Sequence, residues 1–180
     1  METYRLRPHP AHPPRAVSAV EARITGRDEN WLRLRWRIEN SVDLVIPPFA
    51  GKGRADGLWQ TTCFELFLCP EGGEAYCEFN LSPSERWNAY DFTAYREGMR
   101  QRELPREPGC TIRQGSSFAI FDAALPRAGL PTGSCAMALT CVIEERGGRK
   151  SYWALDHATD APDFHDPACF IAQLAAPNAA

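Results

Sequence analysis

Apolar and polar residues alternate along most of this chain, which is typical of β-strands that bury one face. The clearest run is residues 31–39, in which arginines alternate with Leu32, Leu34, Trp36 and Ile38. Three more alternating runs fill residues 58–92, separated by Pro70 with a Gly-Gly pair and by a Ser-Pro-Ser segment. Because proline and glycine favour turns, these runs indicate successive strands.

Such runs recur over the whole chain and give nine to eleven short strands with almost no helix. The best helix candidate is residues 96–109, which Pro105 and Pro108 shorten to a turn or two. Residues 44–46 and 168–174 are expected to form short strands. We therefore predict an all-β fold, an antiparallel β-sandwich of immunoglobulin-like or jelly-roll type.

The chain of 180 residues has the length of one domain. Residues 1–15 are expected to form an N-terminal edge strand followed by a Pro-rich linker, because the prolines there exclude a helix. Residues 16–176 are expected to form a single sandwich domain. These residues contain no internal repeat.

Composition narrows the classes of function. The net charge of -3 is close to balance, whereas a nucleic-acid-binding protein has a strongly basic face. No apolar run approaches the ~20 residues of a membrane-spanning helix, and the N-terminus lacks the apolar core of a signal peptide. The seven cysteines show neither a disulfide framework nor a CxxC motif. We expect reduced thiols, a cytoplasmic location, and no metal, cofactor, nucleic acid or membrane partner.

Polar residues on two of the central runs are the first candidates for a binding site. Glu65 lies on one face of the run 63–68, and the run 76–81 has one face formed by Tyr76, Glu78 and Asn80. If the two runs pair as a hairpin, these four side chains collect on one side of a sheet.

Aromatic residues flank this polar face. Trp59 and Trp87 stand at the ends of the strands, and Asn88 and Tyr90 follow Trp87 closely. A sugar stacks its apolar face on an aromatic ring while its hydroxyls form hydrogen bonds with carboxylates and amides. This combination of residues therefore predicts a site for a polyhydroxylated ligand.

This stretch resembles the DOMON-like superfamily, and within it the family nine carbohydrate-binding modules. The resemblance covers about the last two-thirds of the chain, and its matching segments are residues 58–59, 63–68, 76–83 and 164–170. It implies an antiparallel β-sandwich with a ligand site on one face or edge and a tryptophan near the position of Trp59. It also implies that the loop with His157 and His165 lies near the ligand. Relatives bind sugars or haem.

The same two carboxylates allow other interpretations. Glu65 and Glu78 could act as the general acid and base of a glycoside hydrolase, whose two carboxyl groups lie ~5–9 Å apart. They could instead form structural ion pairs with arginines of the run 31–39, which are Arg33, Arg35 and Arg37.

Two further groups of residues are candidates for binding haem iron or a metal ion. Haem would need an axial pair such as methionine and histidine, for which the chain offers Met99, Met137, His157 and His165. A dense His/Asp group precedes the last strand, but its spacing fits no known metal loop and its aspartates favour turns. This group comprises His157, Asp160, Asp163, His165 and Asp166.

We expect a module that binds a small polar ligand without catalysis, with a carbohydrate as the favoured ligand. The alternatives are a carbohydrate-active hydrolase, a haem-binding DOMON-like domain, and an interaction module whose edge strand pairs with a partner chain. The sequence leaves open which ligand is bound and how many copies of the chain associate.

Overall fold

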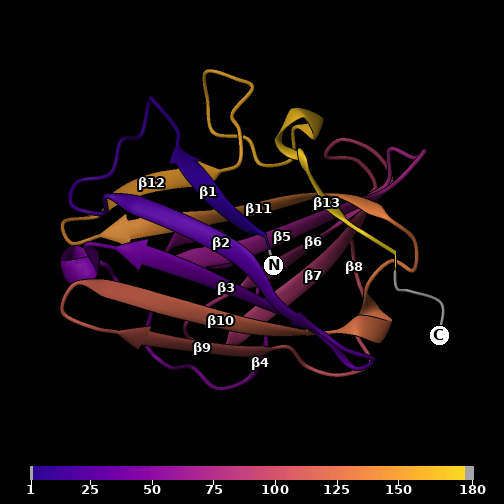
Figure 1. Cartoon of the computed structure of the whole chain (residues 1–180), viewed down its shortest axis with the longest axis horizontal. Coiled ribbons are helices and arrows are strands. Elements are labelled where there is room, and N and C mark those ends of the chain that lie inside the picture. The colour runs from indigo at the N-terminus through magenta and orange to yellow at the C-terminus, as the bar shows by residue number, and fades with distance from the viewer. Residues whose placement is uncertain (1, 177–180) are drawn as a thin grey trace.

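The computed structural model describes residues 2–176, which form thirteen β-strands, four short 3-10 helices and no α-helix (Figure 1). The strands are β1 (Thr3–Pro8), β2 (Ala19–Arg27), β3 (Trp31–Glu39), β4 (Gly53–Arg54), β5 (Cys63–Pro70), β6 (Tyr76–Leu81), β7 (Arg86–Phe92), β8 (Arg100–Gln101), β9 (Gly109–Gln114), β10 (Phe118–Pro126), β11 (Cys135–Glu145), β12 (Arg149–Ala154) and β13 (Ala172–Leu174). The 3-10 helices are η1 (Ser41–Asp43), η2 (Leu58–Gln60), η3 (Arg127–Gly129) and η4 (Pro167–Cys169).

The strands form one strongly curled sheet that folds into two facing layers (Figure 1). Neighbours follow the order β4-β7-β6-β5-β11-β12-β1-β2-β3-β10-β9, with β8 beside β7 and β13 beside β11. These pairs are antiparallel except for β4 and β7, which are parallel. We call β1-β2-β3-β10-β9 the front layer and β4-β7-β6-β5-β11-β12 the back layer. The architecture confirms the predicted all-β sandwich.

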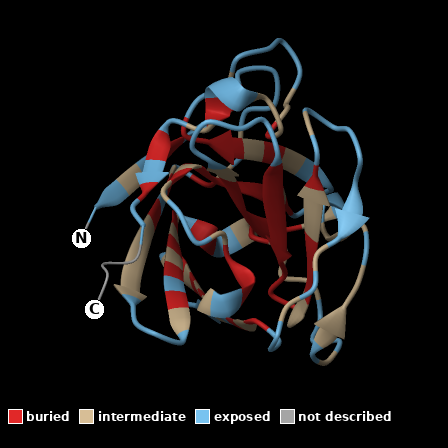
Figure 2. Cartoon of the chain, turned by 90° about the vertical axis from the view of Figure 1, so that its right-hand side faces the viewer, coloured by how far each residue is buried: buried red, intermediate tan, exposed pale blue. Residues whose placement is uncertain are grey.

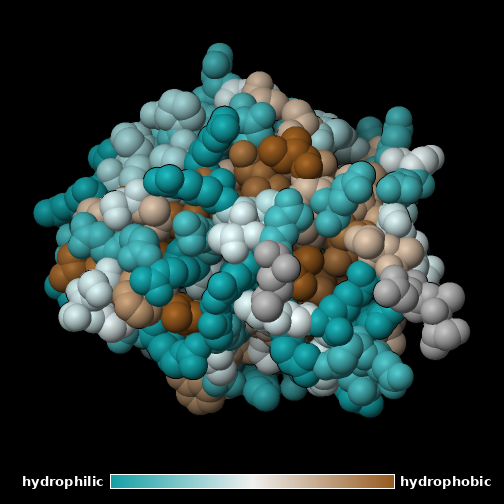
Figure 3. All heavy atoms as spheres, in the orientation of Figure 1, coloured by the Kyte–Doolittle hydropathy of each residue, from teal (hydrophilic) through white to brown (hydrophobic). Residues whose placement is uncertain are grey.

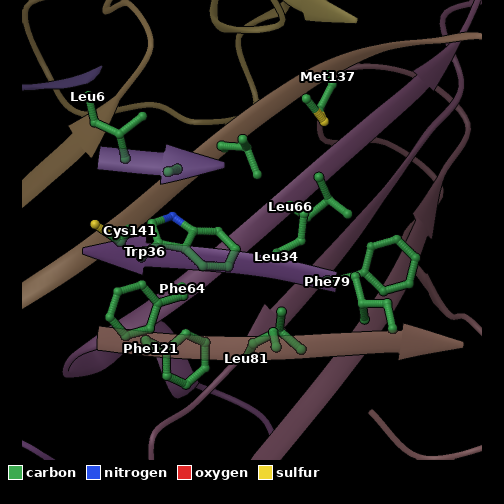
Figure 4. Packing of buried hydrophobic residues seen from close by; sticks show 14 of the residues in the cluster. Leu6, Leu34, Trp36, Phe64, Leu66, Phe79, Leu81, Phe121, Met137 and Cys141 are labelled. Atoms are coloured by element: carbon green, nitrogen blue, oxygen red, sulfur yellow. The ribbon is translucent and has the colours of Figure 1, made fainter. Parts of the chain in front are cut away.

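Apolar side chains fill the space between the layers (Figure 4). Trp36 comes from β3, Phe64 from β5 and Phe121 from β10. The rings of Phe64 and Phe121 stack with centroids 4.1 Å apart, and the ring of Trp36 lies 5.5 Å from that of Phe64. Figure 2 shows the buried residues concentrated in the central strands. This core follows from alternation, which directs every second residue of each strand inward.

The outer side of the front layer is mostly hydrophilic, with small hydrophobic patches between (Figure 3). The arginines predicted opposite the apolar residues of β3 lie here. The cysteines, all seven of them, are free thiols, as the sequence predicts. Within the described residues, no helix is long and apolar enough to cross a membrane.

The N-terminal strand differs from its prediction as an edge strand. β1 pairs with β2 through residues 3–6 and with β12 through residues 7–8, so it carries the sheet from one layer to the other. Its Leu6 is buried in the core between the layers. The short strand is therefore interior because it closes the curl of the sheet.

Residues 96–109, the best helix candidate, contain the two-residue strand β8, an isolated bridge at Glu97, the first residue of β9 and otherwise irregular chain. Arg96 and Gly98 both have positive φ angles, of 56° and 61°, which no right-handed helix contains. The two prolines further along remove the remaining helical positions.

Two predicted short strands are also reduced. Residues 44–46 keep only an isolated bridge between Leu44 and Glu145, because prolines follow directly. Residues 168–174 divide into η4 and β13. The Asp166 carboxylate accepts a hydrogen bond from the Ala168 N–H at 2.9 Å and so starts the 3-10 turn that delays the strand.

Candidate ligand-binding site

The outer face of the back layer buries polar side chains. Glu65 on β5 lies directly opposite Asn80 on β6, and Asn80 lies opposite Asn88 on β7. Glu78 lies opposite Tyr90, two residues along the same strands. Glu65, Glu78 and Asn80 are only 3%, 6% and 3% exposed. The hairpin register therefore brings these side chains together, as the alternation predicts.

A cavity of about 720 Å³ opens over this face. We call Glu65, Glu78 and Asn80 its floor. Other strands contribute Tyr90, Phe92, Val142 and Tyr152. The walls come from the connections between strands and include His12, Asp56, Trp59, Arg96, Met99, Phe164 and His165. The volume lies within the ~300–1,000 Å³ typical of small-molecule sites.

Hydrogen bonds hold the floor residues in place. The Asn80 Nδ2 group donates to Glu78 Oε1 at 2.8 Å, and the Thr140 hydroxyl donates to Glu65 Oε2 at 3.3 Å. Asn80 Oδ1 is buried and has no hydrogen-bond partner among the described residues. The floor is thus fixed by the protein but keeps an acceptor unused.

Burial controls the protonation of the two acids. It raises the pKa of Glu65 well above its ordinary range, and the negative charge of Glu78 raises it further. Burial also raises the pKa of Glu78, to about 7, against the opposing effects of its hydrogen bond with Asn80 and the charge of Arg96. The raised pKa values favour the protonated form of each acid, in which a carboxyl group can both donate and accept hydrogen bonds.

His165 stands beside Glu78 as a neutral ring. The Tyr76 hydroxyl accepts from the Arg96 backbone N–H at 3.2 Å and shares a hydrogen bond with His165 Nδ1 at 2.7 Å. The other ring nitrogen, Nε2, lies 3.7 Å from Glu78 Oε2. Burial lowers the pKa of His165 to about 4, with a further contribution from the charge of Arg96. Tyr76 itself therefore orients His165 from behind the cavity.

The two predicted tryptophans have different positions. Trp59, on η2, is 53% exposed and lines the cavity. Trp87 is only 4% exposed and belongs to the core between the layers, where the Arg54 guanidinium lies 4.2 Å from its ring centre. Trp87 opposite Leu81 shares the inner face of β7, whereas Tyr90 shares the outer face. The structure brings Trp59 to the site and directs Trp87 away from it.

Asn88 supports the cavity from beside it. Its Nδ2 group donates to Asp56 Oδ1 at 2.9 Å, and its Oδ1 accepts from Arg54 Nη1 at 2.9 Å. The Tyr90 hydroxyl donates to the same Asp56 oxygen at 2.6 Å. Asn88 and Tyr90 together fix the loop that leads to Trp59, and of these two only Tyr90 lines the cavity.

His157 and His165 lie in one loop but face different surroundings. His157 Nε2 donates to the Arg7 carbonyl at 2.9 Å, and its ring packs edge-on against His9 at 4.9 Å. It attaches the loop to β1 and does not line the cavity. Only His165 reaches the site.

The alternative of ion pairs with the arginines of residues 31–39 is wrong. Those arginines lie on the outer side of the front layer, while both acids lie on the outer face of the back layer. Arg33 pairs with Asp28, Arg35 with Asp122 and Arg37 with Glu39.

The residues available for haem do not form an axial pair. Met137 is fully buried between the layers, and Met99 is exposed at the cavity wall. His165 Nδ1 is already hydrogen-bonded to Tyr76, and Nε2 lies 3.7 Å from Glu78 Oε2. Among residues 2–176, no group of three or more His, Cys, Asp or Glu side chains is arranged to hold a metal ion.

Sequence reasoning did not identify several wall residues. Asp56 lies in the Gly/Pro-rich segment 47–57 before Trp59, and that composition is the one available signal, because such loops often carry binding residues. His12, Arg96 and Phe164 come from segments remote in sequence, and no local pattern marks them.

No protein-family model matches this sequence, and no curated protein matches it. Solved structures with a similar fold include a proposed carbohydrate-binding protein from Bacteroides uniformis, with a TM-score of 0.65 and 17% identity over 98% of this chain and 86% of that one. A family nine carbohydrate-binding module from Caldicellulosiruptor kristjanssonii is also similar. Its glucose complex gives a TM-score of 0.60 and 8% identity, over 98% and 86% of the two chains. Its cellotriose complex gives 0.56 and 9%, over 98% and 84%. The predicted resemblance to family nine modules is thus confirmed at the level of the fold.

Proposed function

We propose that this protein binds a carbohydrate in the cavity on the outer face of the back layer, without chemical turnover. The observation that carries this proposal is the combination of an exposed indole, Trp59, with a buried polar floor in one cavity. A sugar ring presents an apolar face to an aromatic ring and hydroxyls to polar groups. The glucose and cellotriose bound by a module of similar fold support the same ligand class.

The protonation of the floor also suits a hydroxylated ligand. A neutral carboxyl both donates and accepts, and so does every sugar hydroxyl. Because Glu65 is buried with its pKa raised, it can bind a neutral sugar without leaving an isolated charge in the cavity.

Calorimetric titration with a panel of sugars that includes glucose and cellotriose tests this proposal. We expect wild-type protein to bind at least one of them, and Trp59→Ala and Glu65→Gln to weaken that binding. Trp31→Ala is the matched control, because Trp31 is also partly exposed but belongs to the front layer. Glu71→Gln is the control for the acid, because Glu71 is exposed in the turn after β5. Equal binding by Trp59→Ala and wild type, or no binding at all, would refute the proposal.

The second candidate is the hydrolase, favoured by the unequal pKa values of the two acids. Burial raises the pKa of Glu65 well above its ordinary range, while the pKa of Glu78 lies at about 7. A protonated acid beside an ionisable one is the pairing that glycoside hydrolysis uses. Turnover of an aryl glycoside by wild-type protein that disappears in Glu65→Gln would replace the binding proposal.

A further inference from the structure

The floor of the cavity contains more hydrogen-bond acceptors than the protein uses. Thr140 satisfies Glu65 Oε2, and the Asn80 amide satisfies Glu78 Oε1. The hydrogen bonds made by the described residues reach neither Glu65 Oε1 nor Glu78 Oε2, and Asn80 Oδ1 has no partner. Three oxygens on three neighbouring residues therefore remain for a ligand.

Asn80 is the most informative of the three residues. It is only 3% exposed, and no described residue donates a hydrogen bond to its Oδ1. A buried amide oxygen without a donor destabilises a protein. The Asn80 Nδ2 group donates to Glu78 Oε1, which leaves Oδ1 as the amide atom without a partner. A ligand that supplies a donor at this point would satisfy Oδ1.

The numbers of donors and acceptors distinguish ligand groups. A hydroxyl offers one donor and two acceptors, whereas an ammonium group offers three donors and no acceptor. Its positive charge also strengthens each hydrogen bond with a carboxylate. When both carboxyls are ionised, the three unused oxygens of Glu65, Glu78 and Asn80 are acceptors only, and they then match an ammonium group better than a hydroxyl.

We propose that the ligand is an amino sugar whose ammonium group is bound by Glu65, Glu78 and Asn80. This inference rests on the proposed carbohydrate binding and names the class of sugar.

The other charged groups around the cavity are compatible with a cation. The guanidinium of Arg96 is paired with Asp163 at 2.7 Å, which offsets its positive charge. Burial keeps His165 neutral by lowering its pKa to about 4. Asp56 adds a carboxylate to the wall. The remaining titratable side chains that face the cavity are His12, Tyr90 and Tyr152.

Binding of an ammonium group would change the protonation of the floor. Burial raises the pKa of both floor acids, so the free site holds protons at pH 6. A cation beside them favours the ionised form, so a proton leaves the floor when the amino sugar binds. A neutral sugar releases no proton, which gives a second readout independent of affinity.

The experiment compares ligands on one protein by calorimetry at pH 6. The ligands are glucosamine, galactosamine and mannosamine, each with its parent hexose and its N-acetyl derivative. We expect one amino sugar to bind about tenfold more tightly, or better, than both of its matched forms. The heat of binding should depend on the ionisation enthalpy of the buffer, with the sign of proton release.

Glu65→Gln tests the role of the carboxylate, because it removes the negative charge and introduces an amide group that donates hydrogen bonds. It should remove the preference for the amine, whereas the exposed control Glu71→Gln should keep it. If Glu65→Gln does not fold, the comparison of ligands on wild-type protein still tests the preference for an amino sugar.

Two results would overturn the inference, and only one of them would also refute carbohydrate binding. Equal or tighter binding of the parent hexoses would refute the amino sugar but leave carbohydrate binding standing. That result is expected if the Glu65 proton instead satisfies Asn80 Oδ1 and leaves the floor neutral. Absence of binding by every sugar would refute both proposals together.

Discussion

Strands β5 and β6 are buried on both faces, and the two faces differ in what they bury. The inner face carries Phe64, Leu66 and Phe79, which meet the front layer in the apolar core. The outer face carries Glu65 and Glu78, which are almost as inaccessible. Burial of an apolar side chain contributes roughly 1.5–3 kcal/mol to folding, whereas burial of a polar one costs free energy unless it is paired. Because the two faces are almost equally buried, burial alone does not distinguish the core from the candidate site. The chemistry of the buried side chains does.

The largest expected effect tests the inner face. Leu66→Ala removes a fully buried side chain from the core, and we expect it to lower the free energy of unfolding by about 3 kcal/mol or more. Urea denaturation followed by tryptophan fluorescence measures this change. Ligand affinity of the folded variant should stay close to that of wild type, because Leu66 faces away from the cavity. A loss below about 1 kcal/mol would show that the inner face is not a tightly packed core.

The second prediction concerns the outer face and depends on pH. The pKa values of Glu65 and Glu78 in the folded protein lie above their unfolded values, so the folded state binds more protons. The stability they contribute is fully present below about pH 4.5 and is lost as the pH rises through the folded pKa values. Above pH 6.5 we expect the free energy of unfolding to fall by on the order of 1 kcal/mol for each pH unit.

His165 acts in the opposite direction at lower pH. Its folded pKa of about 4 lies below the ordinary 6.5, so its contribution is lost as the pH falls from 6.5 towards 4. Measurements between pH 6.5 and 8 therefore isolate the two acids. The double variant Glu65→Gln with Glu78→Gln should flatten the slope in that window. A wild-type slope of zero there would contradict the assignment of raised pKa values.

The faces of the central strands could be predicted from sequence because alternation has a period of two. The same rule shows why Trp87 does not reach the site. It lies an odd number of residues from Asn88 and Tyr90, so it shares their strand but not their face. Its position near a strand end suggested a stacking platform, and face parity is the better guide.

The walls of the cavity could not be predicted, because they come from connections without a repeating pattern. His12 and Arg96 both line the cavity although 84 residues separate them in sequence, from 12 to 96. Likewise His157 and His165 share a loop, yet only the second turns towards the cavity. The direction of a loop side chain depends on tertiary contacts that local sequence does not encode.

The third prediction separates the exposed tryptophan from the buried ones. Trp59→Ala should change the free energy of unfolding by less than about 0.5 kcal/mol, because the side chain is 53% exposed. Sugar affinity should fall about tenfold through the loss of stacking. Thermal unfolding and calorimetric titration of the same sample measure both quantities. Unchanged affinity would remove Trp59 from the site while leaving the floor residues in it.

The smallest of the expected effects concerns the outer side of the front layer, which is polar and open to water. Arg35 on β3 makes two hydrogen bonds with Asp122, of 2.6 and 3.0 Å, and both side chains are partly exposed. Because solvent screens such pairs, Arg35→Ala should cost about 1 kcal/mol at most, and less in high salt. Its sugar affinity should equal that of wild type. The same alternation thus places polar side chains on the outer faces of both layers, and the cavity lies over the face that connecting loops cover. Altered ligand binding by Arg35→Ala would contradict the assignment of the candidate site to that face.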